Sequence, residues 1–162
     1  MTDKETILKC TDQALRYLAI REHNEFELKT KLLRKNYDAE TVNKVLENLK
    51  KDSSLSEERY VTSFIRSNNR RHPEGKSLIL QRLASKGTDR SVAQKITHNI
   101  YTEEYTDDLI CRLIENLIRK GKAENLKQAI TKHGFSANEI TRAMSQHTGN
   151  ENSADTCRTN FT

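Results

Sequence analysis

The chain has 162 residues, of which 34% are hydrophobic and 6% aromatic, and its formal net charge is +5. This composition, which includes no tryptophan, disfavours one large apolar core and favours several small ones. No apolar stretch approaches the roughly 20 residues of a membrane helix, and the first residues lack a signal-peptide core, so we expect a cytoplasmic protein without membrane contact.

The distribution of Gly and Pro predicts an all-α fold. There are five Gly and one Pro, and runs of β-branched or aromatic residues are few. We expect nine helices in three groups of three. The first is predicted to run from about Lys4 to Ile20. Its apolar face is predicted to carry Ile7, Leu8, Thr11, Leu15 and Leu18.

Helix-capping residues mark the next elements along the chain. Asn24, with Glu27 three residues later, resembles a capping box and predicts the start of the second helix. Asp38 is expected to cap the third helix and Ser56 the fourth. The fourth helix is then expected to be an amphipathic element of the middle group.

The remaining helices are predicted from the same signals. Pro73 suits the first turn of the fifth helix, and Asp89 or Thr88 is expected to cap the sixth. An apolar stripe from Leu109 to Leu117 predicts the seventh helix, and Gly121 interrupts the helical pattern after it. A second capping box precedes the ninth helix and consists of Ser136 and Glu139.

One apolar pattern occurs three times. Its members are Leu28, Leu32 and Asn36, then Ile79, Leu83 and Gly87, then Leu126, Ile130 and Gly134. Residues four apart share a helix face, and Gly or Asn at the third position suits a left-handed helix end. A second apolar pair follows each copy, so the chain reads as a tandem repeat of about 50 residues.

The repeats predict the domain organisation. We expect repeats at residues 1–51, 52–101 and 102–148, each of three helices, together forming an elongated, curved helical array. Residues 149–162 contain almost no apolar side chains and are expected to be a disordered tail.

Positive charge is concentrated in the middle repeat, where the segment from Arg66 to Arg90 carries a net +5 and the rest of the chain sums to about zero. Arg66 and Arg70 are four residues apart, opposite the apolar stripe of their helix, and should face solvent. Such a stretch is either a solvated surface or the binding site of a phosphate-rich or acidic partner.

The sequence offers little for catalysis. The five His are scattered, and there is no H-E-x-x-H, Gly-rich phosphate loop or nucleophile elbow. Cys10, Cys111 and Cys157 lack ligand spacing and are interpreted as thiols in a reducing compartment. The acidic cluster from Glu103 to Asp108 favours a helix start. We therefore expect no enzymatic activity, no metal and no cofactor.

Three longer stretches resemble a known family. They are Ala14 to Leu28 (ALRYLAIREHNEFEL) with Lys31 and Leu32, Leu55 to Ile65 (LSEERYVTSFI), and Gly75 to Gly87, which fits G-x3-I-x3-L-x2-KG. In order and spacing they resemble the first two repeats of the RecX family. The third repeat matches mainly by periodicity.

The resemblance implies a regulator of RecA that is built of three three-helix repeats and acts as a monomer. Such a protein binds along the groove of the RecA–DNA filament and usually inhibits strand exchange, ATP hydrolysis and coprotease action in DNA repair and the SOS response. Contact with single-stranded or double-stranded DNA stays open. The alternatives are a basic helical-repeat protein that binds DNA without RecA, and a helical adaptor for an unrelated protein.

The resemblance also proposes contact residues. The stronger candidates for RecA or DNA contact are Arg66, Arg70, Arg71, Lys76, Arg82 and Lys86. A second, weaker candidate surface consists of Arg21, His23, Lys31, Arg34 and Lys35. The aromatic residues Tyr17, Phe26, Tyr60 and Phe64 are expected to be core residues.

Overall fold

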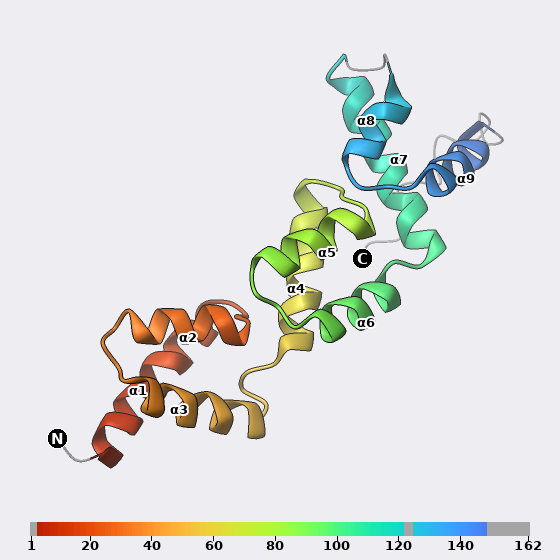
Figure 1. The fold of residues 1–162 in the computed structure, drawn as a ribbon. Coiled ribbons are helices and arrows are strands. Elements are labelled where there is room, and N and C mark those ends of the chain that lie inside the picture. Colours follow the sequence, from red (N-terminus) through yellow and green to blue (C-terminus); the bar gives the residue numbers. More distant parts are fainter. Residues whose placement is uncertain (1–2, 122–124, 149–162) are drawn as a thin grey trace. The chain divides into compact units, whose positions relative to one another are not determined.

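The computed structural model describes residues 3–121 and 125–148, and within these ranges every regular element is an α-helix. The helices are α1 (Asp3–Ile20), α2 (Glu25–Leu33), α3 (Ala39–Lys51), α4 (Glu57–Arg71), α5 (Lys76–Ser85), α6 (Arg90–Ile100), α7 (Glu103–Arg119), α8 (Leu126–Lys132) and α9 (Ala137–Thr148) (Figure 1). The all-α prediction is confirmed. The predicted disordered tail, residues 149–162, lies outside the described residues.

The described residues form two compact units. The first unit comprises the residues up to Phe64 together with Arg82–Ile96, and the second comprises Ile65–Gln81 together with the residues from Thr97 onward. The division passes through α4, α5 and α6, so the middle predicted repeat contributes to both units. The repeat boundaries at 51 and 101 stay predictions.

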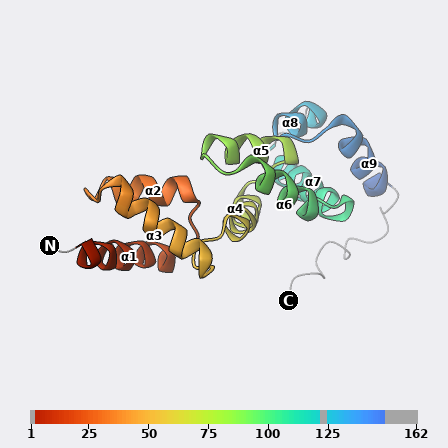
Figure 2. The same cartoon turned by 60° about the horizontal axis from the view of Figure 1, so that its bottom comes forward.

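The core of the first unit lies between α1, α2 and α3, which pack against one another in pairs (Figure 2). The repeated apolar pattern supplies its centre, since Leu28 and Leu32 of α2 are fully buried against Val42 and Leu46 of α3. The other buried members are Cys10, Ala14, Val45, Leu49 and Leu55. Burial of such side chains contributes about 1.5 to 3 kcal/mol each, so these stripes are a main source of the stability of the three-helix core.

The second unit contains a similar core between α7, α8 and α9. Ile130 and Ile140 take the places that the repeated pattern gives them, and Phe135 between the two helices is 2% exposed. The stripe of α7 faces them with Leu109, Ile110, Leu113, Ile114 and Leu117. The weaker third copy of the pattern therefore builds a core of the same kind as the first.

All three copies of the pattern end in the predicted left-handed conformation. The φ angles are 62° at Asn36, 73° at Gly87 and 86° at Gly134. Gly87 N donates to Ala84 O at 3.0 Å and Gly134 N donates to Thr131 O at 2.9 Å, which satisfies carbonyl groups at the helix ends.

Most predicted helix starts are confirmed by hydrogen bonds. The Asp38 carboxylate accepts from Thr41 N at 2.8 Å, and Ser136 forms a reciprocal box in which Ser136 N donates to the Glu139 carboxylate at 2.7 Å. Asp89 accepts from Val92 N at 2.9 Å, so Asp89 rather than Thr88 caps α6.

Three local predictions are wrong. Leu8 and Leu15 are 69% and 44% exposed, because the packed face of α1 follows Cys10 and Ala14, which lie well around the helix from Leu8. Pro73 is buried in the loop before α5, which begins only at Lys76.

Candidate functional site

A hollow of about 250 Å³ opens on the first unit. It is lined by Phe26, Glu27, Thr30, Lys31, Arg34, Tyr60 and Lys86. Helix α2 supplies four of these side chains, and Arg34 is the residue that caps its C-terminal end. Helix α4 supplies Tyr60, and Lys86 follows the end of α5 directly. The structure therefore brings three predicted contact residues to one site, namely Lys31, Arg34 and Lys86, although Lys86 is more than 50 residues away from the other two in the sequence.

Phe26 is the exposed apolar group of the hollow. Its side chain lies in the first turn of α2 and is 60% exposed, so the prediction that it belongs to the core is wrong. A Cβ atom on Gly87 would lie 2.8 Å from Phe26 Cγ, which means that the ring rests against bare backbone there. The sequence held a signal for this exposure, since Phe26 lies 200° around the helix from Leu28.

The two lysines of the hollow contact aromatic rings and, among the described residues, no carboxylate. Lys31 Nζ lies 2.7 Å from His23 Nε2 and 5.0 Å from the centre of the Tyr17 ring, and Lys86 Nζ lies 5.7 Å from the centre of the Phe64 ring. Within the part of the chain that the structure describes, Lys31, Arg34 and Lys86 form no ion pair. Their positive charge is therefore available to a ligand.

The single acid in the lining is already neutralised. Arg21 donates to both carboxylate oxygens of Glu27, one of them at 3.0 Å, and this hydrogen bonding lowers the pKa of Glu27. Arg21 also donates to Glu22 O at 2.9 Å. The predicted contact residue Arg21 thus serves mainly to hold Glu27, and Glu27 is not free to complete a reciprocal capping box with Asn24.

His23 is a positioning residue and not a surface contact. It is 1% exposed, and its Nδ1 donates to Arg21 O at 2.9 Å, which leaves Nε2 to accept from Lys31. Burial lowers the pKa of His23, so the imidazole stays neutral and can accept this hydrogen bond. The buried Tyr60 phenol is also kept neutral, because burial raises its pKa to about 12.

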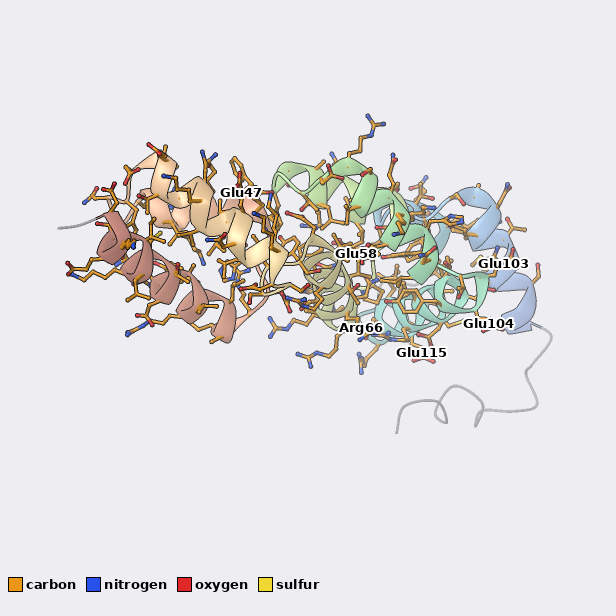
Figure 3. The ribbon with its side chains drawn as sticks, turned by 90° about the horizontal axis from the view of Figure 1, so that it is seen from below. Glu47, Glu58, Arg66, Glu103, Glu104 and Glu115 are labelled. Atoms are coloured by element: carbon orange, nitrogen blue, oxygen red, sulfur yellow. The ribbon has the colours of Figure 1, made fainter. Side chains whose placement is uncertain are left out.

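A second group of predicted contact residues lies at the end of α4 in the second unit. Arg66, Arg70 and Arg71 are all exposed, and Figure 3 shows the Arg66 side chain projecting away from the helix. Asn69 on the same helix turn is 1% exposed and anchors the helix instead. Its amide donates to Tyr101 Oη at 2.8 Å.

The other predicted residues are more dispersed. Lys76 begins α5 and is half-buried, with its Nζ 3.4 Å from His98 Nδ1. Arg82 is exposed on the part of α5 that belongs to the first unit. Arg66, Arg70, Arg71 and Lys76 belong to the second unit and the other five predicted residues to the first.

No group of three His, Cys, Asp or Glu side chains in residues 3–121 and 125–148 is placed to hold a metal ion. In the same ranges no helix is both long and apolar enough to cross a bilayer.

The chain is similar in sequence to known RecX proteins. Residues 10–49 match the family model for the first three-helix domain of RecX. The regulatory protein RecX of Streptococcus gordonii is 30% identical over 138 residues, which are 83% of this chain and 53% of that protein. The regulatory protein RecX of Pelodictyon phaeoclathratiforme is 28% identical over 139 residues, which are 81% of this chain and 84% of that protein. The chain belongs to the RecX family.

A solved RecX structure agrees in fold. The crystal structure of RecX from Lactobacillus salivarius superposes with a TM-score of 0.76 at 21% identity, covering 88% of this chain and 97% of that one. The chain spans about half the length of the Streptococcus gordonii relative. The Streptococcus gordonii and Pelodictyon phaeoclathratiforme relatives are both named regulatory protein RecX, so a regulatory role is the function that their names share.

The RecX match also places the hollow within the family's domain plan. Phe26, Lys31 and Arg34 lie inside the matched first domain, whereas Lys86 lies outside it. The hollow therefore combines residues of the matched first RecX domain with Tyr60 and Lys86, which lie beyond it in the sequence.

Proposed function

We propose that this protein binds the RecA–DNA filament and modulates, and usually inhibits, its ATPase, strand-exchange and coprotease activities in DNA repair and the SOS response. Membership of the RecX family is the observation that carries the proposal. The proposal includes action as a monomer in the cytoplasm, with no catalytic step of its own.

The exposed cations supply a means of binding. The guanidinium groups of Arg66, Arg70 and Arg71 project from the end of α4. A planar guanidinium pairs in a bidentate manner with carboxylates and equally with phosphates. The end of α4 therefore suits either an acidic RecA surface or the DNA that the filament encloses.

Direct DNA binding without RecA is the alternative, and the same arginines support it. The two functions differ in what limits inhibition. A filament regulator acts at far less than one copy per RecA protomer, whereas a competitor for DNA must coat the phosphates. For the competitor, removal of each phosphate contact lowers the log–log salt slope by roughly 0.9.

The test measures ATP hydrolysis by RecA on single-stranded DNA at fixed salt, with this protein titrated below one copy per protomer. The double variant Arg66→Glu, Arg70→Glu is compared with Lys44→Glu, Lys51→Glu, which makes the same charge change on exposed positions of α3. We expect inhibition by the wild type and the α3 variant and its loss in the α4 variant.

Two results would reject the proposal. Hydrolysis that falls only when the DNA is coated assigns the protein to the DNA-binding alternative. No effect at any ratio assigns it to a partner other than RecA. Circular dichroism of each variant checks that the helices are retained.

A further inference from the structure

The hollow of the first unit exposes the aromatic ring of Phe26 to solvent. Exposure of this ring does not stabilise the folded chain. Among the residues that the structure describes, Phe26 is the single aromatic side chain that is mainly exposed, at 60%. Phe buries a large apolar area when it is covered, so an uncovered Phe on a concave surface is typical of a contact site.

The charge around the ring has one sign. Lys31, Arg34 and Lys86 line the hollow without ion-pair partners among the described residues, and Glu27 is neutralised by Arg21. Contacts with His23, Tyr17 and Phe64 hold the two lysines in place before any ligand arrives. A prearranged site of this kind loses less side-chain entropy on binding.

The size and the single ring favour a peptide over a nucleic-acid strand. A hollow of about 250 Å³ accepts one bulky side chain. Proteins that bind single strands stack successive bases on several aromatic rings along a basic groove, and Phe26 offers one ring. A peptide with one apolar residue between acidic residues matches a single ring flanked by cations.

We propose that the hollow binds an acidic segment of a protein partner, with one apolar side chain against Phe26 and its flanking carboxylates on Lys31, Arg34 and Lys86. This proposal rests on the proposed function only for the identity of the partner. If the proposed function is correct, the partner is a RecA protomer. The chemistry of the segment follows from the hollow.

The experiment uses the full chain and a fluorescein-labelled ten-residue peptide of Glu and Ser with one central Phe, and fluorescence anisotropy gives the Kd at fixed salt. Phe26→Ala and Lys86→Glu are each expected to weaken binding about tenfold or more. Arg90→Glu is the matched control, because Arg90 is an exposed cation of the same unit that does not line the hollow.

A second peptide isolates the apolar anchor. Replacing its central Phe by Ala is expected to weaken binding to the wild type about tenfold and to change binding to Phe26→Ala little. If Arg90→Glu weakens binding as much as Lys86→Glu, or if both peptides bind equally, the attraction is general electrostatics and the proposal is wrong.

A single-stranded oligo(dT) in the same assay tests the competing ligand. Binding of oligo(dT) that depends on Phe26 and Lys86 and exceeds that of the peptide would assign the hollow to nucleic acid and overturn the proposal. The peptide assay contains no RecA, so its outcome is separate from the ATPase test. Failure of one leaves the other standing.

Discussion

The imidazole of His23 accepts a hydrogen bond from the Lys31 ammonium group, with 2.7 Å between Nε2 and Nζ. Lys31 lines the hollow, and the other imidazole nitrogen of the buried His23, Nδ1, donates to Arg21 O. A neutral, buried His23 therefore sets the position of a cation that the hollow presents.

This arrangement predicts a pH dependence of stability. Burial lowers the pKa of His23 in the folded chain, whereas an unfolded His takes up its proton near pH 6.5. Between the two pKa values the unfolded state binds more protons, so the free energy of unfolding falls as pH drops below about 6.5, by at most about 1.4 kcal/mol per pH unit.

Urea unfolding of the wild type and His23→Gln between pH 7.5 and 5.5 measures this effect. Gln keeps an acceptor for Lys31 but does not titrate, so the difference between the two curves belongs to His23. We expect the wild type to lose more stability than the variant. An unchanged pH dependence in His23→Gln would show that another group is responsible.

The contact of Phe26 with Gly87 predicts that a methyl group added at position 87 lowers the stability of the folded chain. Gly87→Ala places a Cβ atom 2.8 Å from Phe26 Cγ at a φ of 73°. Gly121→Ala is the matched control, since its φ is 68° and nothing lies within 4 Å of the new atom. The left-handed conformation costs an L-residue about 1 to 2 kcal/mol in both variants.

We expect Gly87→Ala to be the more destabilising of the two, and thermal unfolding measures the difference. Because the two closest contacts are with the ring and only Phe26 Cβ, at 3.1 Å, remains after truncation, the Gly87→Ala substitution should cost clearly less in a Phe26→Ala background than in the wild type. Equal losses for the two single variants would mean that Phe26 moves aside freely.

Asn24 predicts a link between the cap of α2 and the loop after α5. Its side chain accepts from Glu27 N at 2.7 Å and donates to Lys86 O at 2.9 Å and to Thr88 Oγ1 at 3.2 Å. Loss of a cap costs about 1 kcal/mol and each buried hydrogen bond about 1 kcal/mol. Asn24→Ala should therefore cost about 2 to 4 kcal/mol.

Two further variants separate the contributions in urea unfolding. Asn24→Ser retains the cap and loses both links, and we expect it to be intermediate in stability. Thr88→Val removes one acceptor and should cost about 1 kcal/mol. If Asn24→Ser is as stable as the wild type, the links to Lys86 and Thr88 contribute nothing and the cap carries the whole effect.

Local patterns in the sequence predicted the helices and their ends. The stripes of Leu28 with Leu32 and of Ile130 with its neighbours lie in the cores, and Asp38, Ser136 and Gly134 cap their helices as expected. Such predictions succeed because residues four apart share a helix face and because a cap bonds to a backbone group within about four residues.

Tertiary structure decided which residues meet. Phe26 was predicted to be buried, yet it lies exposed against Gly87, and Lys86 joins Lys31 from a segment more than 50 residues away. Leu8 is as apolar as Leu28, yet it faces outward because the phase of α1 is set by its packing on α3. By itself the sequence determined the helical repeats, their caps and the family, because these depend on neighbours along the chain. The hollow depends on contacts between distant segments, and only folding brings those together.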